Sequence, residues 1–347
     1  MEVTANNLPD YLTECARAGI TSMIHGSPAI GKSNIVQQFA DNNNLEMIDV
    51  RLSQSDPIDL GGVLTFNADR TKGELLPLAM FPVESDPLPA GKNGWVLFLD
   101  EITSAHLTVQ AAAFKLTLDK KVGQFNLHKN VVIICAGNLT TDKAIVTKLS
   151  TPMQSRLAHF TLKINNPAWL VWAALAKIDH RIMSFIRFKP DILYRFDPDH
   201  NGDTYPSPRT WEFANRFIKQ WTKIENEHIP LIASVIEEGP AREFFVFCKI
   251  YEELPSIEDI KADPQNVNIK NDPSNQYAIS GLVAHHLKPE NASSLMQFVA
   301  RLPIEFQIIT VKDATSKHKK LMAEPAVYAW TKKNAKEFSP ITSNRAA

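Results

Sequence analysis

The chain contains 347 residues, and its 37 basic and 38 acidic side chains leave a formal net charge of −1. This balance excludes a dedicated polybasic nucleic-acid binder and an acidic disordered chain, and the hydrophobic share of 44% is ordinary for a globular protein. At about 150 residues per domain, the length predicts two domains, each able to bury its own core.

The first half of the chain alternates strand patterns with helical patterns. Asn7 is a candidate helix cap with Pro9 in the first turn. Residues 53–94 are rich in Pro, Gly and Asp, so they are expected to be mostly loop or short elements. The other elements expected in this half are a strand at 21–25, a helix containing Ile35, Val36 and Phe39, strands at 47–52 and 95–99, a helix over 105–120, a hairpin at 121–127, and strands at 131–136 and 159–164.

Two of these strands, 95–99 and 131–136, are continuously apolar. A strand that is buried on both faces has this pattern, as in a parallel sheet covered by helices. The sequence therefore predicts an α/β fold for the first half, with a domain boundary near 165–167. Beyond that point helical spacing dominates, with helices expected at 241–253, 277–287, 292–302 and 303–311 and a loop over 255–275.

A complete phosphate-binding pattern, GxxxxGK[ST], follows the strand at 21–25 and opens a helix. Such a loop turns tightly enough to point successive backbone N–H groups at phosphate oxygens, and the helix adds its positive end. In this pattern the lysine reaches the β- and γ-phosphates of ATP, and the hydroxyl ligates Mg²⁺. The residues are Gly26, Ser27, Pro28, Ala29, Ile30, Gly31, Lys32 and Ser33.

Polar side chains also end the two continuously apolar strands. Asp100 and Glu101 follow the strand at 95–99, and Asn138 follows the strand at 131–136. Ligands of α/β proteins bind at the carboxyl ends of such strands. We expect Asp100 to hold Mg²⁺, Glu101 to polarise the attacking water and Asn138 to orient that water.

With these residues, the chain resembles an AAA+ ATPase over about residues 5–215, and within that superfamily the MoxR-like, helix-2-insert group that includes RavA-type ATPases. The resemblance implies a P-loop NTPase αβα sandwich with a central parallel sheet over 1–165. It also implies a helical lid carrying the sensor-2 motif over 166–240, followed by a helical extension over 241–347. Thr103, Leu139 and Leu157 depart from the group's usual residues, which leaves the subfamily and its client open.

Two arginines gain a role from this resemblance. Arg156, before the strand at 159–164, matches the arginine finger that reaches the nucleotide of a neighbouring subunit. A finger supplied in trans accelerates hydrolysis about 10³–10⁵-fold. Arg209 matches the sensor-2 arginine, with Ser207 as helix cap and Pro208 in the first helical position.

The resemblance implies a ring, a hexamer by expectation, that hydrolyses ATP with Mg²⁺ to remodel a protein complex. Its partner in this group is often a von Willebrand factor A-domain protein. The alternatives are a DNA-linked AAA+ motor, such as a loader or restriction-type translocase, and a nucleotide switch that assembles without hydrolysis. A DNA-linked motor would contact phosphates through the basic tail, expected to be solvated and frayed, formed by Lys312, Lys317, Lys319, Lys320, Lys332, Lys333 and Lys336.

Several other signals predict no site. The run 197–202 opens like a calcium loop, but Pro208 stands at its twelfth position, and adjacent His285 and His286 would point apart on a helix. His25 is expected to pack at its strand end. Cys15, Cys135 and Cys248 lie far apart, the N-terminus lacks a signal-peptide pattern, and no apolar run reaches about 18 residues. We therefore expect a cytoplasmic protein, in a bacterial or bacteriophage-infected cell.

Overall fold

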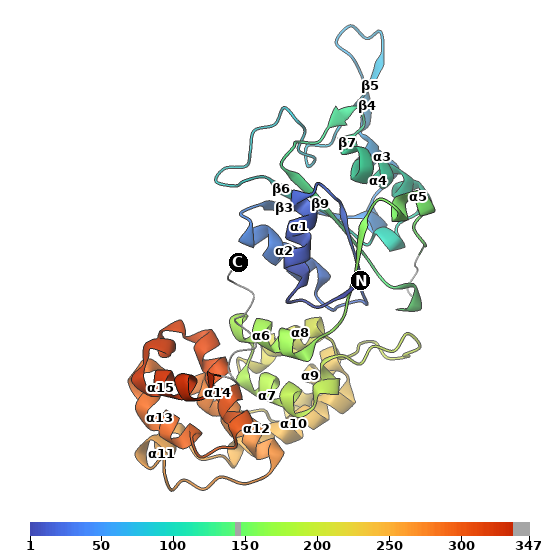
Figure 1. Cartoon of the computed structure of the whole chain (residues 1–347). Coiled ribbons are helices and arrows are strands. Elements are labelled where there is room, and N and C mark those ends of the chain that lie inside the picture. The colour runs from blue at the N-terminus through green and yellow to red at the C-terminus, as the bar shows by residue number, and fades with distance from the viewer. Residues whose placement is uncertain (143–146, 336–347) are drawn as a thin grey trace. The chain divides into compact units, whose positions relative to one another are not determined.

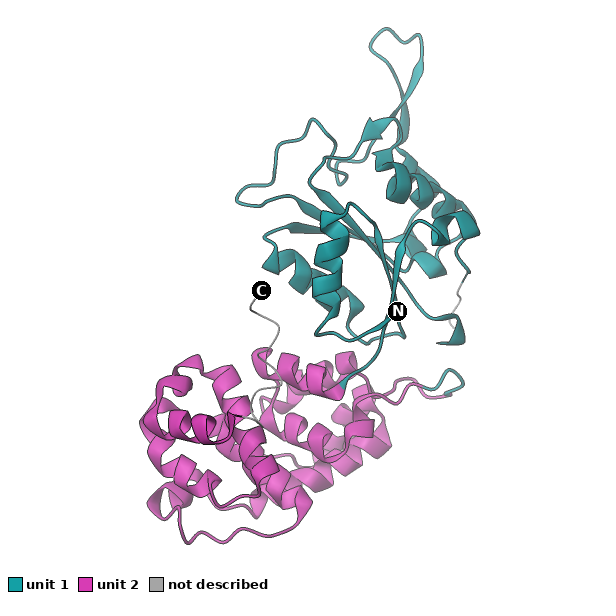
Figure 2. Cartoon of the chain, in the orientation of Figure 1, with its two compact units in different colours: residues 1–165, 197–200 teal, residues 166–196, 201–347 magenta. Residues whose placement is uncertain are grey.

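The computed structural model describes residues 1–142 and 147–335, which form two compact units. Unit 1 comprises residues 1–165 and 197–200, and unit 2 comprises 166–196 and the described residues from 201 onward (Figures 1 and 2). Among the described residues, no helix combines the length and hydropathy needed to cross a bilayer.

Unit 1 is built on a six-stranded sheet in which every neighbouring pair is parallel. This arrangement confirms the predicted α/β class. The strands, in spatial order, are β1 (Glu2–Val3), β10 (Ala158–Leu162), β2 (Ser22–His25), β9 (Val131–Gly137), β6 (Trp95–Asp100) and β3 (Glu46–Arg51).

The central strands bury both faces, because successive side chains belong to opposite hydrophobic clusters. In β2, Met23 packs into one cluster and Ile24 into the other. In β6, Leu97 and Leu99 face the first cluster and Val96 and Phe98 the second, and both faces are fully buried. This alternation explains why the strand sequences are continuously apolar, and it confirms the predicted αβα sandwich.

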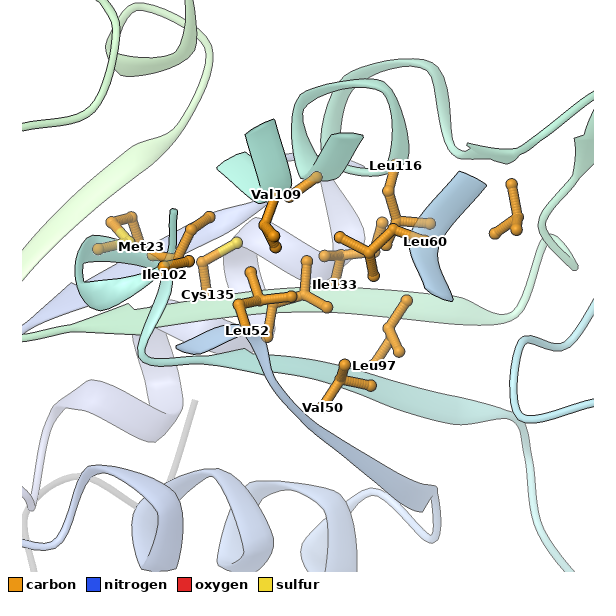
Figure 3. Packing of buried hydrophobic residues seen from close by; sticks show 14 of the residues in the cluster. Met23, Val50, Leu52, Leu60, Leu97, Ile102, Val109, Leu116, Ile133 and Cys135 are labelled. Carbon is orange, nitrogen blue, oxygen red and sulfur yellow. The ribbon is translucent and has the colours of Figure 1, made fainter. Parts of the chain in front are cut away.

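Helices cover both faces of the sheet (Figure 1). On one side α1 (Leu8–Arg17) and α2 (Lys32–Asn42) contribute Leu12 and Phe39 to the core. On the other side α3 (Pro57–Gly61) and α4 (Leu107–Asp119) contribute Leu60, Val109 and Leu116, and Figure 3 shows these packed beside Leu97 and Ile133.

The segment 53–94, expected to be loop or short elements, does contain short elements. It contains α3 and an antiparallel hairpin of β4 (Val63–Phe66) and β5 (Gly73–Leu76). This hairpin exposes apolar side chains, including 70% of Leu64 and 70% of Phe66. Its sequence therefore lacks the alternation of apolar and polar residues that is typical of a half-buried strand. A second short hairpin, β7 (Lys121–Val122) and β8 (Phe125–Asn126), lies where 121–127 predicted one, and α5 (Thr151–Gln154) precedes β10.

The described part of unit 2 is helical and has a hydrophobic core of its own, to which Phe298, Val311 and Trp330 belong. The predicted loop over 255–275 contains a short helix, and the basic residues from Lys312 to Lys333 lie on or between packed helices instead of a frayed tail; Lys336 lies outside the described residues. The helices are α6 (Asn166–Leu175), α7 (His180–Phe188), α8 (Pro208–Ile218), α9 (Ile229–Ile236), α10 (Glu238–Glu252), α11 (Ile257–Ala262), α12 (Pro273–His286), α13 (Ala292–Val299), α14 (Ile304–Lys317) and α15 (Pro325–Lys333).

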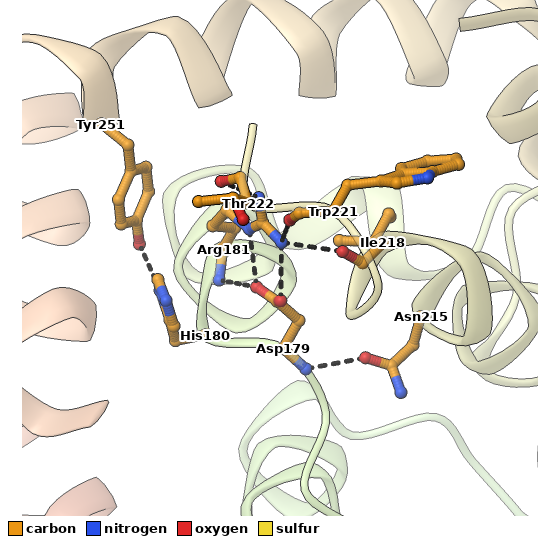
Figure 4. A network of polar contacts seen from close by, with 8 residues as sticks. All are labelled: Asp179, His180, Arg181, Asn215, Ile218, Trp221, Thr222 and Tyr251. Atoms are coloured by element: carbon orange, nitrogen blue, oxygen red, sulfur yellow. Dashed lines mark hydrogen bonds and ion pairs between the residues drawn. The ribbon is translucent and has the colours of Figure 1, made fainter. Parts of the chain in front are cut away.

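A polar network centred on Arg181 lies inside unit 2 (Figure 4). Its guanidinium donates to both carboxylate oxygens of Asp179 at 2.9 Å and to three backbone carbonyls, those of Ile218, Trp221 and Thr222, at 2.8 to 3.2 Å. Burial alone would raise the pKa of Asp179, but the hydrogen bonds and charge of Arg181 lower it to about 2. The network therefore ties α7 to the end of α8 and the turn after it.

All three cysteines are free thiols. Cys135 on β9 is buried in unit 1, and Cys248 on α10 is buried in unit 2, while Cys15 on α1 is partly exposed. Burial raises the pKa of Cys135 to about 12 and also raises the pKa of Cys248.

Candidate nucleotide-binding site

The loop between β2 and α2 has a conformation that requires its glycines. A Cβ on Gly26 would lie 2.6 Å from Cδ1 of Ile30 and 3.3 Å from the carbonyl oxygen of Leu162. Gly31 caps α2 at a φ of +96°, in the left-handed region that favours glycine, and a Cβ there would meet no atom within 4 Å. The loop is thus tightly turned at its start and open at its end, as a phosphate cradle requires.

Lys32 crosses this loop with its ammonium group. Its Nζ donates to the carbonyl oxygens of Gly26 at 2.6 Å and Ser27 at 3.0 Å, and to Oδ1 of Asn138 at 3.0 Å. The sequence separation between Lys32 and Asn138 is 106 residues, so the fold brings the predicted P-loop lysine and the predicted sensor amide into direct contact.

The strand order explains how these residues meet. Because β9 lies between β2 and β6, Asn138 at the end of β9 comes between the P-loop after β2 and the acidic pair at the end of β6. The hydroxyl of Ser33 donates to Oδ2 of Asp100 at 3.0 Å. The two predicted Mg²⁺ ligands therefore lie together at the carboxyl edge of the sheet.

Glu101 has a positive φ of 57°, a costly conformation for a non-glycine residue. Its backbone N–H donates to Oδ1 of Asp100 at 2.8 Å, and its side chain accepts from the hydroxyl of Ser53. The pKa of the neighbouring Asp49 is raised by burial and then by the charges of Asp100 and Glu101, with Arg51 opposing. Negative charge thus gathers at this edge, where a cation would be stabilised.

Sequence reasoning missed two residues that hold the site. The hydroxyl of Thr103 accepts from the backbone N–H of Asn138 at 3.0 Å, and a Cβ on Gly137 would lie 2.5 Å from that hydroxyl. Asp142 accepts from the hydroxyl of Ser27 at 3.0 Å and from the N–H of Leu139 at 3.2 Å. The sequence contained a sign that Thr103 is unusual, because this residue departs from the pattern of the group that the chain resembles. No sequence pattern pointed to Asp142.

The two predicted arginines are not part of this contact network. Arg156 is exposed in the turn between α5 and β10, with its guanidinium carbon 5.8 Å from the centre of the Phe114 ring. Arg209 lies in the first turn of α8 in unit 2, where Ser207 caps the helix through the N–H of Thr210 as expected. Their catalytic roles remain predictions.

The two oxygen donors, from Ser33 and Asp100, fit Mg²⁺ and are too few for a metal ion that takes all its ligands from the protein. Within residues 1–142 and 147–335, no cluster of three or more His, Cys, Asp or Glu side chains is arranged to hold a metal ion. Mg²⁺ keeps several waters and is usually bound through one or two protein oxygens together with substrate phosphates. Ser33 and Asp100 supply that number. The calcium-like run forms a turn in which Asp197 accepts from the N–H of Asp199.

No protein-family model matches the chain, and no curated protein matches it by sequence. Among solved structures, a candidate ATPase from Cytophaga hutchinsonii matches with a TM-score of 0.36 and 11% identity over 95% of this chain and 88% of that one. Two mutants of RuvB from Thermotoga maritima match with TM-scores of 0.39 and 0.38 and 12% identity, over 73% of this chain and 76% and 75% of theirs. At these TM-scores the matches carry no functional argument, so the fold assignment rests on the sheet order and the P-loop.

Proposed function

We propose that the chain binds and hydrolyses ATP with Mg²⁺ at the carboxyl edge of the unit 1 sheet. One observation carries the proposal: Lys32 contacts Asn138 while Ser33 contacts Asp100, so the residues of three sequence motifs meet at one place. A satisfied structural turn would not need a lysine, an amide, a hydroxyl and an acidic pair converging from three strand ends.

In this proposal, the loop from Gly26 to Ser33 holds the phosphates through its backbone N–H groups and the end of α2. Lys32 exchanges its bonds to loop carbonyls for phosphate oxygens, and Asn138 and Glu101 orient the attacking water. Ser33 and Asp100 would hold Mg²⁺, which when bound neutralises charge on the phosphates. Glu101 is held for its role by the N–H···Asp100 contact and by Ser53.

We further propose that the chain is a MoxR-like AAA+ ATPase that forms a ring, with Arg156 completing the site of a neighbouring subunit. The exposure of Arg156 supports this, because a finger supplied in trans must be accessible. Arg209 would contact the nucleotide from a lid over 166–240, and the extension over 241–347 would bind the client, a protein complex or a von Willebrand factor A-domain protein.

Glu101→Gln tests the chemistry. We expect the variant to bind ATP normally and to lose turnover by about 10²–10⁴-fold, because the amide cannot accept the water's proton. Glu46→Gln, an exposed carboxylate at the start of β3, is the matched control and should turn over normally. Normal turnover in Glu101→Gln would refute the assignment.

Ring formation is tested separately. Turnover per subunit should rise with protein concentration and be lost in Arg156→Ala, while Arg242→Ala, another exposed arginine, should behave as wild type. DNA added at low salt should not stimulate turnover; strong stimulation that declines with salt would favour the DNA-linked motor.

A further inference from the structure

Two histidines, one on the P-loop strand and one on its neighbour, meet edge to edge with nearly coplanar rings. His25 is the last residue of β2, and His159 lies on β10, where the parallel register pairs Met23 with His159 and His25 with Thr161. Both side chains therefore lie on the same face of the sheet. Their ring centroids are 5.3 Å apart with planes 17° from parallel, and Nε2 of His25 is 3.0 Å from Nδ1 of His159.

The second nitrogen of His159 fixes the direction of this bond. Its Nε2 lies 2.7 Å from the carbonyl oxygen of Gln154, and a carbonyl can only accept, so Nε2 carries the hydrogen. When His159 carries its single ring hydrogen on Nε2, its Nδ1 must accept and Nε2 of His25 must donate. Burial, followed by the charges of His159 and Lys32, lowers the pKa of His25 to about 4, so this ring is uncharged at neutral pH.

The resulting chain of hydrogen bonds has functional segments at both ends. His25 directly precedes Gly26, whose carbonyl accepts from Lys32 and whose N–H donates to Gly137. Gln154 ends α5, two residues before Arg156, and its side chain donates to the carbonyl of Leu149 at 2.6 Å. The bonds therefore join the base of the P-loop to the turn that carries Arg156.

We propose that His25 and His159 are positioning residues that hold the Arg156 turn in register with the P-loop of the same subunit. Through these two histidines, nucleotide bound in one subunit's P-loop fixes the position of Arg156, which that subunit supplies to the nucleotide site of its neighbour. This inference rests on the proposed function. An imidazole with one ring hydrogen suits the task at His159, because one ring nitrogen accepts while the other donates.

Two variants of His25 separate the hydrogen bond from the packing. His25→Gln retains an N–H donor near the position of Nε2 and loses the ring, whereas His25→Phe retains an aromatic ring and loses the donor. We expect His25→Phe to lower kcat about tenfold with KM for ATP unchanged, and His25→Gln to stay within about threefold of wild type. A lower kcat in both variants, in neither, or only in His25→Gln would overturn the proposal, as would a rise in KM alone.

Mixed rings locate the effect. Subunits with Glu101→Gln bind ATP and supply Arg156 but do not hydrolyse ATP, and subunits with Arg156→Ala can hydrolyse ATP but supply no finger, so their mixture should recover turnover at shared interfaces. Adding His159→Phe to the Glu101→Gln subunit should reduce the recovered turnover about tenfold, because that subunit supplies the arginine. An unchanged recovery would contradict the coupling.

A spectroscopic measurement keeps the proposal testable apart from hydrolysis. In the full chain with ¹⁵N-labelled histidine, both rings should show the Nε2–H tautomer, and a non-hydrolysable ATP analogue with Mg²⁺ should shift the His159 resonances in wild type but not in His25→Phe. If the analogue binds and no ATP is hydrolysed, only the proposed function fails. If ATP is hydrolysed and the His159 resonances do not shift when the analogue is added, only the coupling fails.

Discussion

Lys32 in unit 1 and Arg181 in unit 2 both donate hydrogen bonds to several backbone carbonyls, but they differ in surroundings. Arg181 is paired with Asp179, and only 9% of its side chain is exposed. Lys32 is partly exposed and donates to two loop carbonyls and the neutral amide of Asn138.

The difference separates a structural network from a binding site. A buried, charge-paired donor cannot exchange partners without leaving a carboxylate uncompensated, so it stabilises one conformation. A partly exposed lysine at the open side of a loop can exchange backbone carbonyls for phosphate oxygens at little cost. Substitutions in the two networks should therefore affect different observables.

The largest effect is expected for Lys32→Ala, which should reduce ATP turnover on the order of 10³-fold, because it removes a charge aimed at the developing phosphate charge. The unfolding free energy of unit 1 should change little. Lys129→Ala, an exposed lysine before β9, is the control and should have no effect on turnover. Turnover of Lys32→Ala equal to that of the control would remove Lys32 from the site.

Arg181→Ala should show the opposite behaviour and destabilise unit 2 by about 3–5 kcal/mol, because it leaves Asp179 buried without its partner. Hydrogen exchange in α7 and α8 would measure this local loss. Arg242→Ala breaks an exposed pair with Glu238 and should cost less than about 1 kcal/mol. Similar protection in the two variants would mean that the Arg181 network is not structural.

The stability of unit 2 should depend on pH through a buried histidine next to the Arg181 network. Burial lowers the pKa of His180 to about 3, opposed by Asp179 and assisted by His285. Below about pH 6.5 the unfolded chain takes up a proton at this residue while the folded chain does not, so stability is full above that pH and falls toward pH 3. We expect at most about 1.4 kcal/mol per pH unit from His180.

Protection of α7 against hydrogen exchange at pH 7.5 and pH 5, corrected for intrinsic rates, measures this loss. His180→Phe should flatten the dependence. Asp179, with its pKa lowered to about 2, stabilises the fold above about pH 4 and loses that contribution only as the pH falls further. A loss confined to pH values below 4 would assign the acid sensitivity to Asp179 instead.

The smallest effect is expected at Thr103. Thr103→Val keeps the shape but removes the acceptor for the N–H of Asn138, which should lower kcat about three- to tenfold by loosening the amide. Thr103→Ser keeps the hydroxyl and should retain most of the activity. Equal kcat values for the two variants would show that the hydroxyl does not position Asn138.

The sequence predicted the elements of unit 1 well because their signals are local. The apolar strands at 95–99 and 131–136 and the P-loop pattern need no tertiary information, and they place Lys32, Asp100 and Asn138 at strand ends. The contacts of Thr103 and Asp142 were not predictable, because a hydroxyl or carboxylate becomes part of a site only when the fold brings a distant N–H or hydroxyl to it.

Errors elsewhere have similar causes. The β4–β5 hairpin lies in a segment for which only loop or short elements were predicted, and its position was not given because its exposed apolar residues do not alternate. The lysines from Lys312 to Lys333 suggested a solvated tail, yet Val327 and Trp330 between them are buried. His25 was expected only to pack, and its partner His159 is 134 residues away.

Each unit contains a buried free cysteine whose alkylation would report the local unfolding of that unit. A thiolate reacts and a thiol does not, so Cys135 inside unit 1 and Cys248 inside unit 2 are protected both by exclusion of reagent and by their raised pKa values. A brief pulse of alkylating reagent should modify Cys15 first and reach each buried thiol only when its own unit opens. Mass spectrometry of the labelled peptides would then time the opening of the sheet and of the helical unit in one sample, without any engineered label.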